Sequence, residues 1–335
     1  MLRVWFNHWF STAYNIAELM REYGDIYIIG SNRNINAVMS GACDEWYSEP
    51  DICGEEYIAF CLDFCKKNGV DVFVPRRQMT YISRSMKSFE DIGVKVMAES
   101  FDVISLLEDK RAAYELFSHS EKINVPEYAV VNDRQSFLSA YEDMKRRCSQ
   151  LCVKFIQDEG ALSFRKITPE RRFDPRMYVK ADVTPEELCG YFDGRDKSPD
   201  MMLMPYLSGT EISVDCLDTS FGLIAVPRYK TSGRHEYIKY DRGILSAANE
   251  AVKTAGLGMP CNIQFRMLDG KPYLLEVNTR MSGGIQMSCL AAGINIPMLA
   301  LAKLMGEERK WSINRIERTV SYIERPCIIE DRKEK

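Results

Sequence analysis

Short apolar runs alternate with segments of helical periodicity over the first hundred residues. Buried strands are predicted at residues 2–6, 26–29, 71–74 and 95–98. Helical periodicity over residues 12–23 and 55–67 stops beside Gly24 and Gly69, as is typical of helix C-termini. Strands that alternate with helices in this way favour a parallel sheet with right-handed crossovers. The N-terminal part is therefore predicted to be an α/β domain.

The pattern changes from about residue 108 onward. Helices are predicted over residues 109–119, 136–147, 244–255 and 296–305. Strands are predicted over residues 123–131, 151–156, 164–167 and, as a strand-rich stretch, 201–230. We therefore predict three domains, at residues 1–107, 108–200 and 201–335.

Charge and hydropathy narrow the class of protein. The net charge of -4 comes from 44 basic and 48 acidic residues, so we expect no nucleic-acid partner, which would favour a basic surface. No apolar run reaches the roughly 18–20 residues of a membrane helix, so no membrane partner is expected. The N-terminus lacks the basic and apolar regions of a signal peptide. We expect a cytoplasmic protein.

Several common kinds of site do not fit the sequence. The 11 cysteines form no Cys-x-x-Cys pair, and none is spaced as a zinc ligand from one of the three histidines. Buried, reduced thiols are the favoured interpretation, and a Cys–His nucleophilic site is not supported. No strand is followed by Gly-x-Gly-x-x-Gly, and no Walker A sequence occurs.

The clearest candidate chemistry lies in a predicted hairpin at residues 261–280. Since strand side chains alternate between faces, polar residues would share one face of each strand. On the first strand these are Asn262, Gln264 and Arg266, and on the second they are Glu276, Asn278 and Arg280. Magnesium prefers oxygen ligands and usually takes one or two carboxylates together with phosphate oxygens. Glu276 and Asn278 can supply two protein ligands, Gln264 can supply a third, and Arg280 can hold a phosphoryl group.

The register of the hairpin tests this interpretation. A two-residue loop at Asp269-Gly270 would place Gln264 opposite Leu275, and therefore on the other face from Glu276. A shared site requires a loop with an odd number of residues or a bulge, and we predict one of the two.

Four segments of the C-terminal part also match a known family in order and spacing. They are Asn262-Ile-Gln-Phe, Tyr273-Leu-Leu-Glu-Val-Asn-Thr-Arg, Ser282-Gly-Gly and Ala292-Gly-Ile-Asn-Ile-Pro. Together they resemble the signature of ATP-grasp enzymes, closest to the halves of carbamoyl phosphate synthase large subunits. The match spans about residues 108–306. It implies an α/β (α+β grasp) fold, in which a Rossmann-like N-terminal domain precedes a two-part ATP-grasp module.

The resemblance also implies roles for individual residues. Gln264, Glu276 and Asn278 would bind Mg²⁺ or Mn²⁺ with the phosphates of ATP, and Arg280 would assist phosphoryl transfer. The remaining implied positions are Lys110 and Lys154 at the phosphates, backbone groups of Met204 and Tyr206 at adenine, Glu211 at the ribose, and Arg228 or Lys230 as a further catalytic cation. Individually some have plainer readings: Lys110 could be a solvated charge, and Ser282-Gly283-Gly284 a structural turn.

One segment departs from the family pattern. The phosphate loop at residues 157–166 contains a single glycine, Gly160, where the family usually has several. Glycine lets backbone N–H groups approach phosphate closely. The side chains of Ser163, Arg165 and Lys166 can substitute for it; otherwise the loop is weak and turnover is slow or regulated.

The function that follows from the resemblance is an ADP-forming carboxylate–amine ligase. ATP would phosphorylate a carboxylate, and an amine would then displace phosphate from the acyl phosphate. The expected partners are a small-molecule carboxylate and an amine, and a homodimer is the default assembly. Three alternatives stay open: carbamoyl phosphate synthase-like carboxyphosphate chemistry, a non-catalytic ATP-binding regulatory protein, and a kinase that phosphorylates an alcohol. The sequence names neither substrate.

Overall fold

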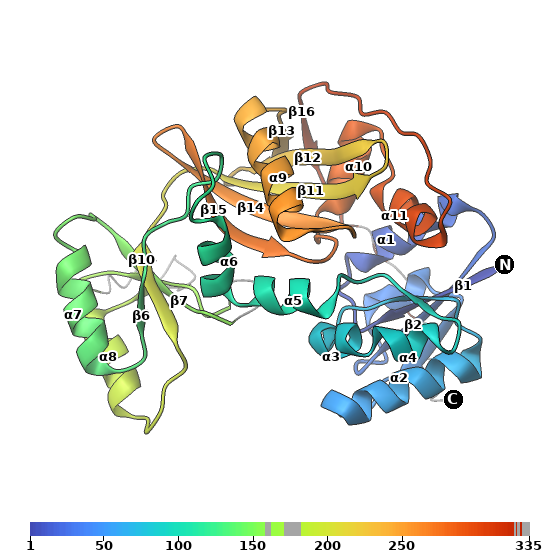
Figure 1. The fold of residues 1–335 in the computed structure, drawn as a ribbon, viewed down its shortest axis with the longest axis horizontal. Helices are drawn as coiled ribbons and strands as arrows, with labels where there is room; N and C mark the ends of the chain where they lie inside the picture. The colour runs from blue at the N-terminus through green and yellow to red at the C-terminus, as the bar shows by residue number, and fades with distance from the viewer. Residues whose placement is uncertain (158–161, 171–181, 325, 327–328, 330–335) are drawn as a thin grey trace. The chain divides into compact units, whose positions relative to one another are not determined.

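The structure is a computed structural model that describes residues 1–157, 162–170, 182–324, 326 and 329 (Figure 1). It divides into two compact units. Unit 1 contains Met1–Leu107, Thr210–Phe265 and Glu276–Lys335, and unit 2 contains Glu108–Gly209 and Arg266–Leu275. The chain passes between the units at 107/108, 209/210, 265/266 and 275/276. The division into three domains at residues 1–107, 108–200 and 201–335 stays a prediction.

Unit 1 begins with a parallel sheet, which confirms the predicted α/β class. Its strand order is β3-β2-β1-β4-β5, and every pair is parallel. The strands are β1 (Leu2–Asn7), β2 (Ile26–Asn32), β3 (Glu45–Ser48), β4 (Val72–Val74) and β5 (Lys95–Val96). The helices are α1 (Ala13–Met20), α2 (Gly54–Asn68), α3 (Met79–Arg84), α4 (Met86–Glu90) and α5 (Phe101–Glu108), whose last residue belongs to unit 2.

The central strand of this sheet is apolar on both faces because helices cover both. Val4 and Phe6 of β1 pack in one core with Ile16 of α1, whereas Trp5 packs in another with Phe64 of α2. Such a strand reads as a continuous apolar run and not as an alternating one.

A second sheet completes unit 1, apart from its hairpin tip, which belongs to unit 2. The strand order is β15-β14-β11-β12-β13-β16. The strands are β11 (Glu211–Thr219), β12 (Gly222–Lys230), β13 (His235–Ile238), β14 (Cys261–Leu268), β15 (Lys271–Asn278) and β16 (Arg318–Ser321). The helices are α9 (Arg242–Ala255), α10 (Ile285–Ala292) and α11 (Ile296–Met305). Leu217 and Val226 share a core with α1, which explains why the N- and C-terminal parts form one unit.

Unit 2 is built on a smaller mixed sheet with strand order β6-β10-β7-β8-β9. The strands are β6 (Ala129–Val131), β7 (Leu151–Phe155), β8 (Arg165–Ile167), β9 (Asp182–Val183) and β10 (Met201–Pro205). The helices are α6 (Lys110–Phe117), α7 (Arg134–Met144) and α8 (Pro185–Asp193). Phe137 of α7 and Phe192 of α8 pack with Val153 and Leu203 of the sheet.

The β14–β15 hairpin corrects one prediction. Its loop contains two residues, Asp269 and Gly270, and both have positive φ (49° and 75°), as in a type I′ turn. The expectation of an odd-numbered loop is therefore wrong. The buried residues of β15, Leu274 and Val277, are three positions apart, so strict alternation breaks between them. A bulge, the other predicted device, has this effect.

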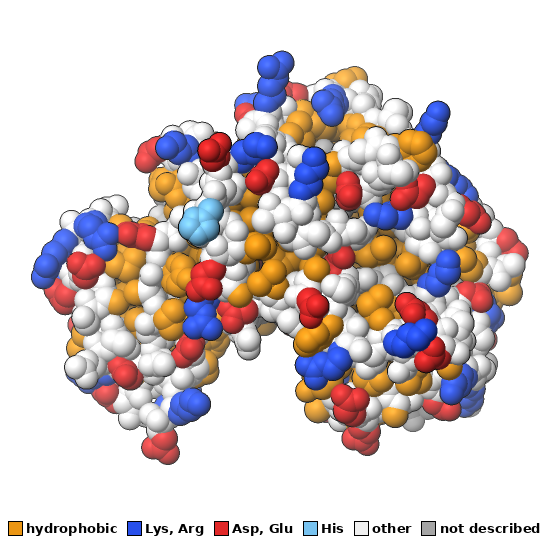
Figure 2. Space-filling model, viewed as in Figure 1, with side chains coloured by type: hydrophobic (Ala, Val, Ile, Leu, Met, Phe, Trp, Pro, Cys, Tyr) orange, Lys and Arg blue, Asp and Glu red, His pale blue; other side chains and the backbone are white. Residues whose placement is uncertain are grey.

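The surface carries charges of both signs, and the helices are short. Figure 2 shows basic and acidic side chains interspersed on the face in view. In the described part of the chain, no single helix is long and apolar enough to cross a membrane. Among the described residues, α10 and α11 together are long and apolar enough, but they are bent by 97°, and both contribute to the core of unit 1.

Gly209 supplies a stability prediction within unit 2. A Cβ atom at this position would lie 1.6 Å from the backbone oxygen of Met267, so no side chain fits. We expect Gly209→Ala to destabilise the protein by about 1–3 kcal/mol through overpacking. The matched control is Gly190→Ala in α8, where a Cβ would meet nothing within 4 Å. Alanine there should stabilise by roughly 0.5–1 kcal/mol. Urea unfolding would measure both; a neutral Gly209→Ala would contradict the close approach.

Candidate active site

A buried arginine forms hydrogen bonds with polar side chains from several elements of unit 1. Arg228 on β12 is only 2% exposed. Its guanidinium donates hydrogen bonds to Asp215 Oδ2 (3.0 Å), Ser288 Oγ (2.9 Å), Ser282 Oγ (2.9 Å), Ser213 Oγ (3.2 Å) and Glu236 Oε2. Burial alone lowers the pKa of Arg228, but the carboxylates of Asp215 and Glu236 outweigh burial and raise it.

This environment corrects the role assigned to Arg228. A catalytic cation needs a surface that the substrate can touch, and Arg228 is enclosed by protein partners. We therefore regard it as a positioning residue. Lys230, the other candidate on β12, has a side chain that is 40% exposed and forms an ion pair with Glu211 on β11. Of the two cations, Lys230 is the one that solvent reaches, and the ribose role of Glu211 stays a prediction.

The network around Arg228 extends to the hairpin. Asn262 is 1% exposed, and its amide donates to Asp215 Oδ1 (2.8 Å) and Ser213 Oγ (2.9 Å). Its Oδ1 accepts from Gln264 Nε2 at 3.4 Å. Arg228 is thus joined through Asp215 and Asn262 to Gln264, one of the predicted metal ligands.

The two other predicted metal ligands contact each other. Asn278 Nδ2 donates to Glu276 Oε1 at 2.9 Å, and both side chains are half-buried. This bond leaves the amide oxygen of Asn278 and the second carboxylate oxygen of Glu276 to face a cation. Among the described residues, no three His, Cys, Asp or Glu side chains form a metal-binding group. One carboxylate and one amide suit Mg²⁺, which commonly adds phosphate oxygens and water to few protein ligands.

Whether Gln264 joins this pair depends on the break in alternation along β15. With a two-residue loop and regular pairing, Gln264 would face away from Glu276. The break between Leu274 and Val277 allows Glu276 to lie on the face of Gln264. The metal role of Gln264 stays a prediction.

The Ser282–Gly284 loop is fixed by Arg228. A Cβ atom at Gly284 would lie 2.4 Å from Arg228 Nη1, so only glycine permits the guanidinium to approach. Ser282 Oγ accepts from the backbone N–H of Gly284 (3.2 Å) as well as from Arg228. The structure thus gives this loop a defined structural role, and a role in holding substrate stays a prediction.

Arg280, the predicted catalytic arginine, stacks on an aromatic ring in unit 1. Its guanidinium carbon lies 5.5 Å from the centroid of Phe10, and that of Arg76 lies 4.5 Å from the same ring. Cation–π contacts of this kind hold a guanidinium in place while its N–H groups remain able to donate.

In unit 2, Lys154 and Lys110 occupy β7 and the first position of α6. Lys154 Nζ donates to Tyr114 Oη (3.0 Å) and to the backbone oxygen of Leu275 (3.3 Å). Leu275 directly precedes Glu276 in the sequence. Lys110 is 7% exposed, and its Nζ donates to the backbone oxygen of Ile156 at 3.4 Å. Lys110 is therefore not the solvated surface charge of the plainer reading.

The backbone pairing of β10 corrects the adenine prediction. Ile156 N–H donates to Asp200 O (3.1 Å), and Tyr206 N–H donates to Gln150 O (2.9 Å). Since hydrogen-bonded pairs alternate along an antiparallel ladder, the backbone groups of Met204 also face β7, at Cys152. Met204 and Tyr206 therefore direct these groups into the sheet. Of the neighbouring residues, Pro205 has no N–H and its backbone oxygen accepts from Cys152 Sγ at 3.8 Å, whereas the backbone oxygen of Leu207 accepts from Arg266 Nη1 at 2.7 Å.

The Tyr206 side chain lies among cations of unit 2. Arg266 Nη1 donates to Tyr206 Oη (3.3 Å) and to Leu207 O (2.7 Å), and Lys166 Nζ lies 4.8 Å from the Tyr206 ring centroid. Gly160, the single glycine of the phosphate loop, lies outside the described residues.

Eight of the ten cysteines that the structure describes are buried, as expected, whereas Cys53 is exposed and Cys148 is half-buried. Burial raises the pKa of Cys65, Cys152 and Cys289 to about 12, so these groups stay protonated at neutral pH. A thiolate nucleophile is not supported at these positions.

Asp215, Ser213 and Ser288 had no predicted role. Asp215 is wholly buried between the apolar residues Val214 and Cys216 of β11, and Ser213 lies directly opposite Arg228. A carboxylate inside an apolar run was the available signal, because an unpaired buried charge is costly and a partner must exist.

The chain is similar to known proteins in sequence and in fold. Residues 197–326 match a protein-family model described as "ATP-grasp in the biosynthetic pathway with Ter operon". The arginine-specific carbamoyl phosphate synthase large chain of Geobacillus stearothermophilus is 22% identical over 319 residues, which cover 89% of this chain and 28% of that protein. The carbamoyl phosphate synthase large chain of Clostridium perfringens strain SM101 is 22% identical over 293 residues, covering 75% and 27%. The chain thus spans less than a third of these relatives.

Solved structures share the fold at low sequence identity. The biotin carboxylase domain of 2-oxoglutarate carboxylase from Hydrogenobacter thermophilus, solved as a dimer with MgADP, ADP and bicarbonate, has a TM-score of 0.69 at 16% identity, covering 92% of this chain and 71% of that one. The L-amino acid ligase of Bacillus licheniformis has a TM-score of 0.65 at 15% identity, covering 92% and 76%. At such identities the likeness establishes the fold.

Proposed function

We propose that this chain, which has the ATP-grasp fold and matches an ATP-grasp family model in its C-terminal part, is a magnesium- and ATP-dependent ligase. It would activate a carboxylate as an acyl phosphate and pass the acyl group to an amine, with release of ADP and phosphate. The observation that carries the proposal is the Glu276–Asn278 pair, a carboxylate and an amide held 2.9 Å apart on one strand.

Each unit supplies groups suited to one part of this task. Glu276 and Asn278 would hold Mg²⁺ or Mn²⁺, which supplies charge neutralisation at the phosphates when bound. Arg280 would stabilise the transferring phosphoryl group, and Lys154 and Lys110 would bind the phosphates of ATP. The carbonyl of Pro205 and the N–H of Leu207, not Met204 and Tyr206, would meet adenine. No protein nucleophile is required.

Similarity to carbamoyl phosphate synthases supports one alternative, the phosphorylation of bicarbonate, which the experiment below includes. The two relatives named above are carbamoyl phosphate synthase large chains, so bicarbonate is a candidate for the carboxylate that is phosphorylated. The L-amino acid ligase is the structural neighbour that favours an amino acid. Location in the cytoplasm and assembly as a homodimer remain part of the proposal.

The test is ADP release with Mg-ATP across bicarbonate, amino acids and other carboxylates, each with and without an amine, with Glu276→Gln as the blank. Release that requires one carboxylate and one amine, and that is lost in the variant, would establish the ligase. Release with bicarbonate alone would favour carboxyphosphate chemistry. Tight Mg-ATP binding without release under any condition would favour a regulatory nucleotide-binding protein.

A further inference from the structure

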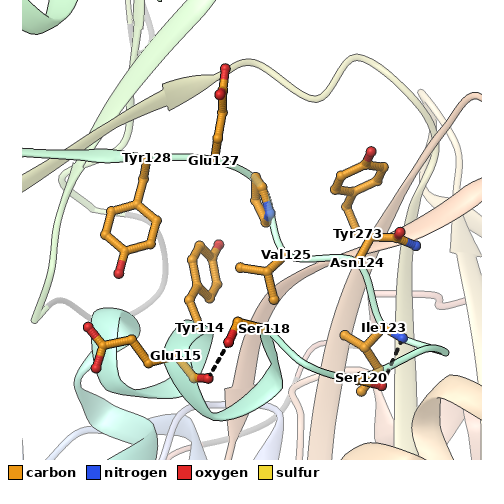
Figure 3. Close-up of a pocket in the computed structure, with 11 residues that line it drawn as sticks. Tyr114, Glu115, Ser118, Ser120, Ile123, Asn124, Val125, Glu127, Tyr128 and Tyr273 are labelled. Atoms are coloured by element: carbon orange, nitrogen blue, oxygen red, sulfur yellow. Dashed lines mark hydrogen bonds between the residues drawn. The ribbon is translucent and has the colours of Figure 1, made fainter.

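A cavity of ≈ 510 Å³ opens within unit 2, between α6 and the segment that leads to β6 (Figure 3). None of its residues has a predicted role in the ligase chemistry. The side chains that matter for its chemistry are those of Tyr114, Glu115, Ser118, Val125, Tyr128 and Tyr273. The cavity therefore combines three tyrosines with a carboxylate and little else that is charged.

The aromatic rings are fixed in position and carry polar groups. Tyr114 and Tyr128 contact each other edge to face, with ring centroids 5.9 Å apart and planes at 63°. Within the described part of the chain, the hydroxyls of Tyr128 and Tyr273 have no hydrogen-bond partner. Figure 3 shows the Tyr128 hydroxyl on the same side of the cavity as the Glu115 carboxylate. A ligand with N–H donors could be bound by both oxygens.

The charged side chains that line the cavity are acidic. Glu127 also lines it, but its carboxylate accepts from Arg147 at 2.8 Å and points away in Figure 3. Glu115 forms no ion pair with any described basic residue. Burial and then the charge of Glu115 raise the pKa of Tyr128, whereas the charge of Arg111 lowers it and that of Asp109 raises it. Glu115 thus outweighs Arg111 at this hydroxyl of the cavity.

We propose that this cavity binds a small organic cation, an alkylammonium or a guanidinium. The faces of tyrosine rings attract cations within about 6 Å of their centroids. Glu115 supplies a charge-assisted acceptor, and the Tyr128 hydroxyl supplies a second acceptor. An anionic ligand would meet the unpaired carboxylate, and an apolar ligand would leave that carboxylate and the Tyr128 hydroxyl without partners.

The site is connected to a predicted ATP-binding lysine. Tyr114 is 1% exposed; its hydroxyl donates to Leu275 O at 3.1 Å and accepts from Lys154 Nζ at 3.0 Å. Lys154 Nζ also lies 5.1 Å from the Tyr114 ring centroid. A cation against the same ring would repel Lys154 and compete for the ring. We expect it to weaken Mg-ATP binding; this coupling rests on the proposed function, whereas the binding of the cation does not.

Calorimetry without nucleotide tests the binding. Agmatine and butylammonium are the cationic probes, and 1-butanol and butyrate are the neutral and anionic counterparts. We expect the wild-type protein to bind the cations at least roughly tenfold more tightly than either counterpart, because charge-assisted hydrogen bonds are the strong ones. Equal binding of agmatine and 1-butanol, or no binding of either cation, would overturn the proposal.

Two variants locate the site. Glu115→Gln should weaken agmatine binding roughly tenfold or more, since a charged partner is lost. Glu127→Gln is the matched control, because the same change removes a carboxylate of the cavity rim that is already paired with Arg147. Equal losses in the two variants would indicate general surface electrostatics and would overturn the assignment. Glu115 is exposed and on a helix surface, so the substitution should not affect folding.

Tyr114→Phe tests the coupling separately. It keeps the ring that faces the cavity and removes the hydroxyl that joins Lys154. We expect agmatine to bind this variant and still to weaken its binding of Mg-ATP, because the shared ring and the positive charge of Lys154 are both retained. Loss of the agmatine effect in the variant would overturn the route through the ring of Tyr114. If no Mg-ATP binds to the wild type, the proposed function fails, while the calorimetric test of the cation site still gives its own answer.

Discussion

Glu276→Gln is expected to lower ADP release by at least about a thousandfold while the protein remains folded. A metal ion contributes several kcal/mol of charge stabilisation during phosphoryl transfer, and each 1.36 kcal/mol corresponds to about tenfold in rate. The substitution preserves the volume of the side chain. It also keeps an oxygen that can accept from Asn278 Nδ2, now 2.9 Å from Glu276 Oε1, so only the charge is removed.

The control for this experiment is Glu317→Gln in the same unit. The Glu317 carboxylate is exposed and accepts from the Tyr237 hydroxyl at 2.7 Å, so the same chemical change occurs away from the candidate site. ADP release should be nearly unchanged there. Wild-type release in Glu276→Gln would remove Glu276 from the metal site and leave the proposed mechanism without its central group. Partial rescue of Glu276→Gln by Mn²⁺ would instead support a weakened metal site.

The parts of the fold that the sequence predicts are those with a local signal. The parallel sheet around β1 follows from apolar runs that alternate with helical periodicity, and the structure confirms it. The grouping of the units does not follow, because it depends on contacts between distant segments. Leu217 and Val226 of the second sheet pack with α1, and no local pattern in the sequence predicts that contact.

In the candidate site, too, features with a local sequence signal were predicted, and features that depend on strand pairing were not. Glu276 and Asn278 lie two residues apart on one strand, so alternation alone predicts that they share a face, and their hydrogen bond confirms it. The position of Gln264 relative to them depends on the hairpin loop and on a break in β15; of the two predicted devices the two-residue loop excludes the odd-numbered loop and leaves the bulge. Met204 and Tyr206 were misassigned for a related reason: the direction of a backbone group depends on which neighbouring strand it pairs with, which requires the register.

Replacing the buried Arg228 is expected to have a large effect on the stability of the protein. Arg228→Met should destabilise the protein by about 3–5 kcal/mol, because it leaves the carboxylate of Asp215 buried without its cation. The side chains of Arg228 and Asp215 are only 3% and 1% exposed, so water cannot replace the lost partner. Methionine retains much of the apolar stem, which separates the loss of charge from the loss of volume. Urea unfolding would measure the difference.

Lys230→Met is the matched control, two residues further along the same strand. The Lys230–Glu211 pair has side chains 40% and 20% exposed, so its removal should change stability by only about 0–1 kcal/mol. In Arg228→Met, adding Asp215→Asn should restore part of the lost stability, since the uncompensated charge is gone, although the amide still needs hydrogen-bond partners. A loss below about 1 kcal/mol in Arg228→Met would show that solvent reaches the cluster, and the catalytic role that we withdrew from Arg228 would then have to be reconsidered.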